Sequence, residues 1–415
     1  MNVATLTEIT GCEVCGNTHL RSAVDLGNHP MCDDLVPVGD ARNCKEYPIE
    51  ILFCEICRTA HQRFQIPKQE LFPSSYHYRS RHTADVLNGM KALVDVCEAT
   101  LGSLSSKIVL DVGCNDGSLL SFFAEKGAKT VGVEPTGAAA DAQERGHRVI
   151  NDFFSEETAN QVLREFGSPD VITFTNVFAH IEDLKGLLRA LAAVANQNTL
   201  IVIENHYLGS IIDKFQFDTF YHEHPRTYSL TSFVHIAESL GMKIVRAEFP
   251  ARYGGNIRVF LSAELDDGAA HKAISSIDAQ ERNFGVGLDE LAARIPVWRE
   301  AKRAQIDHEV AKRGPLSAKA FPGRAAIPMK MLGLSTDHIV GCYEKPSSAK
   351  VGHYVPGSRI PILSDDALSF EMVGDGPILN LAWHISGEIR TYMRDRGYKG
   401  DFLDIISPDD FAGPR

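Results

Sequence analysis

The chain has 415 residues, of which 44% are hydrophobic and 23% charged, which is enough apolar mass for roughly two or three domains. Its 42 basic and 54 acidic side chains give a formal charge of −12, so it lacks the excess of Lys and Arg that binds nucleic acid or anionic membranes. No basic region with a following apolar run opens the sequence, and no 18-residue stretch is free of charged or turn-forming residues, so we expect neither a signal peptide nor a membrane span. We therefore predict a cytoplasmic protein, a monomer or weak oligomer, with no nucleic-acid or membrane partner.

Most of the nine cysteines lie in the first hundred residues, which read as irregular and show no strongly periodic helix before about Asp85. Cys12, Cys15, Cys54 and Cys57 form two C-x-x-C pairs with 38 residues between them. An odd cysteine count with paired spacing favours metal binding or free thiols over disulfides. Two such turns can close four thiolates around Zn²⁺ and leave no position for water, so we predict a structural zinc site. Four unrelated buried thiols are the alternative.

From Lys107 the sequence alternates short β-branched runs with amphipathic stretches, which is typical of a parallel sheet covered by helices on both faces. The runs are 108–110, 130–133, 171–174 and 199–203. A helix over 230–241 follows, and then come two more strand candidates, 243–247 and 256–261. Because their connection is short, we expect these two strands to be antiparallel.

The rest of the chain divides into a connector and a third compact region. Residues 269–305 are polar and helix-prone, with apolar side chains near helical spacing, and predict a helical connector that packs one face. From about Ala318, apolar runs and Pro-Gly turns return and end in a strand candidate at 378–382. We therefore predict an α/β chain with domains at 1–75, 76–268 and 269–415.

A loop that contains two glycines, Asp111 to Ser118, directly follows the first strand run and precedes a helix start. Gly113 and Gly117 allow a tight turn at the carboxyl end of a strand, where open α/β sheets bind ligands. Their G-x-x-x-G spacing differs from the G-x-G-x-x-G of dinucleotide-binding folds, so an NAD-dependent oxidoreductase is the weakest alternative. Glu134, 23 positions after Asp111, ends the next strand with a carboxylate suited to two ribose hydroxyls.

Asp111, the glycine loop that follows it and Glu134 together resemble the S-adenosylmethionine site of class I methyltransferases. By this resemblance Asp152 and Phe153 flank the adenine, and Asn176 lies beneath the methionine moiety. The residues that the resemblance assigns to the cofactor are Asp111, Gly113, Asn115, Asp116, Gly117, Ser118, Glu134, Pro135, Asp152, Phe153 and Asn176.

A second group of chemically active residues lies after the fourth strand run, in the segment 217–226. It contains Tyr221, His222, Glu223 and His224. Two imidazoles, a carboxylate and a phenol can supply a general base, an orienting partner and an oxyanion donor. This set suits removal of a proton from a carbon next to a carbonyl group.

The motifs, in their order, resemble those of the sugar C-methyltransferases that act on nucleotide-linked 4-keto-deoxysugars. The likeness extends over nearly the whole chain and is carried by the four cysteines and by residues 111–118, 176–180, 221–224, 254–258 and 350–362. It implies a central class I methyltransferase domain of Rossmann-like fold, an N-terminal zinc-binding domain and a second Rossmann-like domain at the C-terminus. S-adenosylmethionine is the implied cofactor and a nucleotide sugar the implied small-molecule partner.

The resemblance also implies roles for individual residues. His224 is the implied base that removes the sugar C-3 proton, and Glu223 sets its orientation. Tyr221 and His180 line the same pocket, and Tyr76 or Tyr78 belongs to an aromatic stretch on the substrate side. The implied substrate contacts are Asn205, Arg324, Lys350 and Tyr354.

Two segments depart from the family pattern. Residues 321–326 stand where the family commonly has a glycine turn of Tyr-Gly-Ala type. Glu344-Lys345 stand where Asp-Arg or Asp-Lys is usual in the family. The identity of the nucleotide and of the sugar therefore stays open. An O- or N-methyltransferase and a zinc-containing binding protein with an inactive methyltransferase core are the alternative functions.

Overall fold

The computed structural model describes residues 6–72, 81, 84–265, 270–374 and 376–411. Tyr76 and Tyr78 lie outside the described residues, so their predicted role stays a prediction. Within the described ranges, the helices are too short or too polar to cross a bilayer.

A seven-stranded sheet forms the centre of the molecule, with the strand order β13-β14-β11-β10-β7-β8-β9. Its strands are β7 (Ile108–Val112), β8 (Lys129–Val133), β9 (Arg148–Ile150), β10 (Val171–Thr175), β11 (Leu200–His206), β13 (Lys243–Glu248) and β14 (Asn256–Ser262). The strands β7 to β11 are parallel, and β14 is antiparallel to both β11 and β13. The predicted strand runs and the antiparallel pair are confirmed, whereas the three residues of β9 are too few to show a periodicity.

Helices cover both faces of this sheet because its strands are apolar on both sides. One face packs against α2 and α3, and the other against α5, α6 and α8. The helices of this region are α2 (Ala84–Leu101), α3 (Ser118–Glu125), α4 (Ala138–Glu144), α5 (Glu156–Phe166), α6 (Leu184–Val194), α7 (Leu208–Asp213) and α8 (Leu230–Ser239). Ser155 and Ser229 begin α5 and α8 with capping boxes, which satisfy backbone amides at the helix starts.

The N-terminal region is more regular than its sequence suggests. Its elements are β1 (Thr7–Glu8), β2 (Arg21–Pro30), β3 (Val36–Pro37), β4 (Glu46–Phe53), β5 (Ala60–Gln62), β6 (Phe64–Gln65) and α1 (Lys68–Leu71). A four-stranded sheet has the order β12-β5-β4-β2. Its edge strand β12 (Arg226–Thr227) begins at the end of residues 217–226, which we call the histidine-rich segment. The expectation of an irregular region was wrong because β2 contains Gly27 and two register shifts against β4, which interrupt the alternation of apolar and polar residues.

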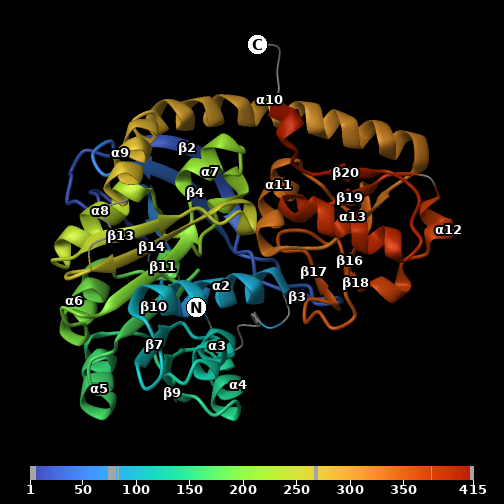
Figure 1. Ribbon diagram of the computed structural model, residues 1–415. Helices are drawn as coiled ribbons and strands as arrows, with labels where there is room; N and C mark the ends of the chain where they lie inside the picture. Colours follow the sequence, from blue (N-terminus) through green and yellow to red (C-terminus); the bar gives the residue numbers. More distant parts are fainter. Residues whose placement is uncertain (1–5, 73–80, 82–83, 266–269, 375, 412–415) are drawn as a thin grey trace.

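Helices α9 (Ala270–Glu281) and α10 (Phe284–Arg313) connect the two halves of the chain. Figure 1 shows α10 arching over the molecule from the N-terminal and central regions to the C-terminal domain. Its buried residues lie at helical spacing and include Leu288, Leu291, Ile295 and Trp298. The prediction of a helical connector that packs one face is confirmed.

The C-terminal region contains a second parallel sheet, with the strand order β18-β16-β15-β19-β20. Its strands are β15 (Leu316–Lys319), β16 (Ile339–Glu344), β18 (Ile362–Ser364), β19 (Ile378–Asn380) and β20 (Phe402–Asp404). The helices here are α11 (Ala326–Met331), α12 (Phe370–Val373) and α13 (Ser386–Asp395), and β17 (His353–Tyr354) pairs with β3 of the N-terminal region. The predicted second Rossmann-like domain is therefore present.

Candidate active site

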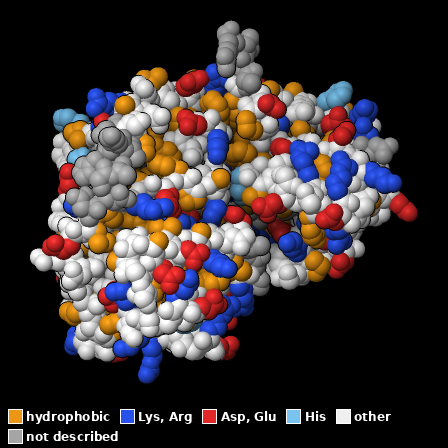
Figure 2. Space-filling view, viewed as in Figure 1, with side chains coloured by type: hydrophobic (Ala, Val, Ile, Leu, Met, Phe, Trp, Pro, Cys, Tyr) orange, Lys and Arg blue, Asp and Glu red, His pale blue; other side chains and the backbone are white. Residues whose placement is uncertain are grey.

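A cavity of about 980 Å³ lies where the three regions meet. It is lined by loops at the carboxyl ends of β7, β8 and β10, by the histidine-rich segment, and by the loops after β15 and β16. Figure 2 shows side chains of both charges, with histidine, gathered at the surface where the two lobes of the molecule join. The cavity is thus built from parts of all three regions.

The glycine loop forms one end of this cavity. Gly113 has φ 71°, and a side-chain carbon there would lie 2.5 Å from Val177, so only glycine fits. Asn115 also has a left-handed backbone, with φ 49°, and its backbone amide donates to the Glu134 carboxylate at 3.0 Å. Glu134 accepts a second bond from the Thr136 amide at 2.9 Å. The loop and the acid of the next strand therefore hold each other in place.

Two buried carboxyl groups, Asp111 and Glu134, lie at this end. Burial, opposed by a hydrogen bond from Thr173 and supported by the charge of Glu134, raises the pKa of Asp111 to about 7. A cationic ligand beside Asp111 and Glu134 would favour both carboxylates in their charged form. The residues therefore fit S-adenosylmethionine, which carries a sulfonium cation, and a ribose whose hydroxyls need an acceptor.

Not every residue assigned to the cofactor reaches the cavity. Asp111, Gly113, Asn115, Glu134, Pro135, Phe153 and Asn176 line it. The others support the loop instead: the Asp116 carboxylate accepts bonds from Ser118 and from the Arg81 amide, and Gly117 starts α3 in a left-handed conformation. Asp152 accepts a bond from the Phe153 amide.

The histidine-rich segment lines the cavity around His224. Nδ1 of His224 lies 3.0 Å from the Thr219 carbonyl, which only accepts, so Nδ1 carries the proton and Nε2 keeps its lone pair. The His224 ring centroid lies 4.1 Å from that of Tyr221, 4.8 Å from that of His180 and 5.1 Å from that of His206.

These imidazoles are held neutral. Burial, with the charges of His180 and His206, lowers the pKa of His224 well below its usual range. Burial also lowers the pKa of His206 to about 3 and that of His384 well below 6.5. The sequence analysis did not select His206 or His384 as site residues, although each lies at or just after the carboxyl end of a strand, which is the signal that would have found them.

The partner that orients His224 is a correction to the sequence analysis. Nδ1–H of His224 donates to the Thr219 carbonyl and not to the Glu223 carboxylate. Glu223 contributes its backbone carbonyl, which accepts a bond from Nδ1 of His180 at 2.6 Å. The side chain of Glu223 lines the cavity, where burial and then the charge of Asp33 raise its pKa well above 4.5.

The C-terminal domain supplies cationic side chains to the cavity lining. Arg324 lines it but is paired with Asp218 through two bonds of 2.8 and 2.7 Å. Lys350 also lines it, and its ammonium group donates to the Phe321 carbonyl at 2.8 Å. Tyr354 instead accepts a bond from the Gly39 amide, so it ties two regions together.

Asn205, another predicted substrate contact, is buried away from the cavity lining. Its side-chain oxygen accepts a bond from the Ala179 amide at 3.3 Å. Asn205 therefore supports the turn that carries His180.

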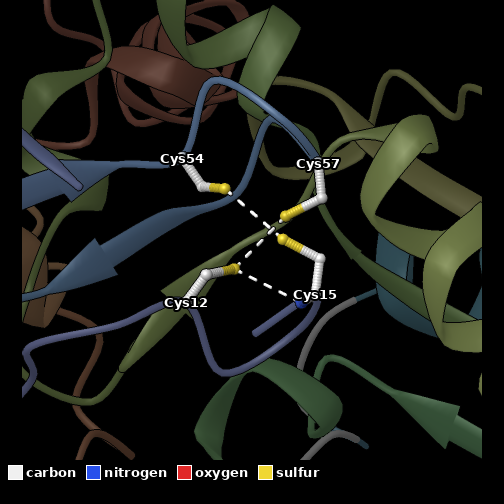
Figure 3. A group of neighbouring side chains, drawn as sticks. All are labelled: Cys12, Cys15, Cys54 and Cys57. Carbon is white, nitrogen blue, oxygen red and sulfur yellow. Dashed lines mark hydrogen bonds between the residues drawn. The ribbon is translucent and has the colours of Figure 1, made fainter. Parts of the chain in front are cut away.

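The four paired cysteines come together in the N-terminal region. Figure 3 shows their sulfur atoms pointing toward one another, and all four Sγ atoms lie within 4.8 Å of one another. The Sγ atoms of Cys12 and Cys57 are 3.3 Å apart, and those of Cys15 and Cys54 are 3.6 Å apart. Zn–S bonds of about 2.3 Å in a tetrahedron need sulfur separations of about 3.8 Å, so this set fits a zinc ion without an open position. The predicted zinc site is confirmed as a place that can hold the metal.

Models of three protein families match successive parts of the chain. A zinc binding domain matches residues 12–72, a methyltransferase domain matches 82–247, and a C-methyltransferase C-terminal domain matches 251–404. C-methyltransferase NovU of Streptomyces niveus is 28% identical over 389 residues, which cover 92% of this chain and 91% of that protein.

Other similarities are limited to the central region. The ubiquinone biosynthesis O-methyltransferase of Aeromonas salmonicida (strain A449) is 26% identical over 164 residues, which cover 34% of this chain and 66% of that protein. The solved structure of magnesium protoporphyrin IX methyltransferase from Synechocystis PCC 6803 is 17% identical, with a TM-score of 0.34 over 43% of this chain and 82% of that chain.

Proposed function

Since the chain belongs to the S-adenosylmethionine-dependent C-methyltransferases that join a zinc-binding, a methyltransferase and a C-methyltransferase C-terminal domain, we propose that it methylates a nucleotide-linked 4-keto-deoxysugar. The methyl group goes to the carbon next to the ketone, through an enolate that His224 forms as the base. The observation that carries this proposal is the single cavity that Gly113 and His224 line together with Lys350.

The proposed cofactor site is the end formed by Gly113, Asn115 and Glu134. Glu134 accepts hydrogen bonds from the backbone amides of Asn115 and Thr136 and from the Thr136 hydroxyl, and it keeps one lone pair, on Oε2, for a ribose hydroxyl. Phe153 offers a flat apolar face to the adenine, and Asn176 lines the adjoining part of the cavity. Bound there, S-adenosylmethionine supplies an electrophilic methyl group on its sulfonium sulfur.

His224 has the properties that the proposed base needs. Its Nδ1–H donates a hydrogen bond to the Thr219 carbonyl, so Nε2 is the atom that accepts the proton. Burial keeps the ring neutral at neutral pH, and only a neutral imidazole can act as a base. A ketone acidifies the neighbouring C–H bond, so a well-positioned imidazole suffices to remove the proton.

The enolate oxygen needs hydrogen-bond donors as its charge develops. Tyr221 is one proposed donor, because burial raises the pKa of its phenol well above 10 and keeps it protonated. Glu223 is the second, since burial and the charge of Asp33 favour its neutral, proton-carrying form. His180 holds the segment in place through its bond to the Glu223 carbonyl.

The proposed site for the substrate's diphosphate lies at the opposite end of the cavity. Lys350 and Lys345 line this end, and both carry ammonium groups that suit phosphate oxygens. Arg324 is paired with Asp218, so its main contribution is to shape the wall.

The test is turnover of the purified protein with S-adenosylmethionine and a panel of nucleotide-linked 4-ketosugars. We expect S-adenosylhomocysteine to be released together with a product that NMR shows to carry a methyl group on carbon. A methyl ether or a methylamine product would contradict C-methylation and support an O- or N-methyltransferase. No release with any ketosugar would support a binding protein.

A second measurement examines the enolate separately. In deuterated water without cofactor, the protein should exchange the proton next to the ketone for deuterium. Methylation on carbon without any such exchange would contradict a freely formed enolate.

A further inference from the structure

Arg226 is a fully buried cation, with 0% of its side chain exposed, that follows His224 by two residues. It begins β12, which pairs with β5 so that Arg226 lies opposite His61. The preceding Pro225 carbonyl accepts a bond from the Gln62 amide at 2.8 Å. The loop that carries His224 therefore passes directly into the N-terminal sheet.

The guanidinium group of Arg226 contacts the turn that follows His180. Nη2 donates to the carbonyl of Ile181, and Nη1 donates to the carbonyl of Glu182 at 3.1 Å. Ile181 and Glu182 are the two residues after His180, and both line the cavity. One side chain thus joins the segments that carry His180 and His224.

The same guanidinium also reaches the zinc-binding turn. Nη1 donates to the carboxylate of Glu13 at 2.7 Å, and Nε donates to the hydroxyl of Tyr228 at 3.0 Å. Glu13 follows the zinc ligand Cys12, and it accepts a further bond from Gln65 at 2.9 Å. Arg226 therefore links the metal-binding turn, the turn after β10 and the histidine-rich segment.

We propose that Arg226 is a positioning residue that keeps His180 and His224 at their working separation and anchors both to the zinc-binding turn through Glu13. The inference rests on the proposed function, because it assumes that His224 is the base. Arginine suits this task since its planar group presents five N–H donors in a fixed fork. Lysine has the same charge, but its three donors lie on one nitrogen and cannot serve both buried carbonyls, Glu13 and the Tyr228 hydroxyl, so at least one of these four acceptors would be left unpaired.

The experiment compares Arg226→Lys with Arg63→Lys, which changes an arginine of the same region that pairs with Glu8 and Glu50 and is 38% exposed. For Arg226→Lys we expect kcat to fall about 100-fold, because a misplacement of about 1 Å has this effect. We expect zinc content, the S-adenosylhomocysteine Kd and the ketosugar KM to change less than about threefold, since the proposed binding residues lie elsewhere. Arg63→Lys should match the wild type.

Nitrogen-15 NMR of the histidine rings provides a readout that is independent of turnover. In the wild type, His180 and His224 should give Nδ1–H signals that exchange slowly, because both protons bond to backbone carbonyls. In Arg226→Lys these two signals should shift or exchange faster. The Nε2–H signal of His29, which bonds to the Leu26 carbonyl, should stay in place. Loss of kcat with unchanged His180 and His224 signals would overturn the proposal, as would a folded variant with kcat within about threefold of the wild type.

A second variant, Glu13→Gln, decides the matter if Arg226→Lys does not fold. It keeps an oxygen acceptor for Arg226 but removes the charge, so we expect about a tenfold loss of kcat and the same NMR change at smaller size. Unchanged NMR signals in this variant would overturn the proposal. If the wild type methylates no ketosugar, the proposed function fails, while the NMR comparison still tests the positioning role.

Discussion

The central and C-terminal sheets share a parallel core but present opposite charges to the same cavity. At the carboxyl ends of β7 and β8, the central sheet presents Asp111 and Glu134. In the C-terminal domain, the segment after β16 presents Lys345 and Lys350, while Glu344 at the end of β16 also lines the cavity and accepts a bond from the Phe321 amide. The strands are equivalent in architecture, so the difference lies in the loops.

Under the proposed function, this difference would let one cavity bind two ligands of opposite charge. Carboxylates suit the sulfonium cation and ribose hydroxyls of the cofactor, whereas ammonium groups suit a diphosphate. His224, in the histidine-rich segment, lines the same cavity. The charge separation therefore predicts that each end can be weakened without the other.

His224→Ala should give the largest effect, because it removes the proposed base and leaves the carboxylates and the ammonium groups of the cavity intact. We expect kcat to fall about 1,000-fold, within the range for loss of a general base. Calorimetry should find the S-adenosylhomocysteine Kd unchanged, and deuterium exchange into the ketosugar should stop. His308→Ala, on the exposed face of α10, is the control. A parallel loss of cofactor affinity would mean that the base and the cofactor end are not separate.

Glu134→Gln should weaken the cofactor end selectively. We expect the Kd for S-adenosylmethionine to rise about 10- to 100-fold, because bonds to a charged acceptor are worth about 1.5–3 kcal/mol. The loss should be smaller for S-adenosylhomocysteine, which lacks the sulfonium charge. Calorimetry with both ligands measures this difference. Glu144→Gln, at an exposed position of α4, is the control. A rise in the KM for the nucleotide sugar instead would reverse the assignment of the two ends.

The pH dependence should report the buried state of His224. Burial lowers its pKa, so the ring stays neutral, and able to accept a proton, below the usual value of 6.5. The acid limb of kcat/KM should therefore lie below pH 6.5, with activity falling about tenfold per pH unit only beneath the folded-state pKa. A rate profile from pH 4.5 to 9 tests this, and an acid limb above pH 6.5 would contradict it.

Lys350→Met should have the smallest effect and act on the substrate end. We expect the KM for the nucleotide sugar to rise about tenfold, since one charge-assisted bond is lost while Lys345 remains. Initial rates at several ionic strengths should also show a weaker salt dependence. Lys312→Met, exposed on α10, is the control. A changed S-adenosylmethionine Kd would show that Lys350 also acts on the cofactor end.

The local patterns of the sequence predicted the features that depend on neighbouring residues. Strand, glycine loop and helix follow one another within 108–125, so the place of a small-molecule site could be predicted from their order, and the resemblance to class I methyltransferases then indicated the cofactor. The C-x-x-C pairs indicated the metal for the same reason, because each turn brings two thiolates together by itself. The resemblance to C-methyltransferases then pointed to His224 within the histidine-rich segment.

Only the tertiary structure decided which distant side chains meet. Arg324 pairs with Asp218 across 106 positions, and Arg226 joins Glu13 across 213. The Thr219 carbonyl that orients His224 could not be predicted either, since a backbone group carries no signature in the sequence. Periodicity predicts which end of a strand a residue occupies, but contacts between loops depend on how separate sheets pack, and that packing is a property of the whole fold.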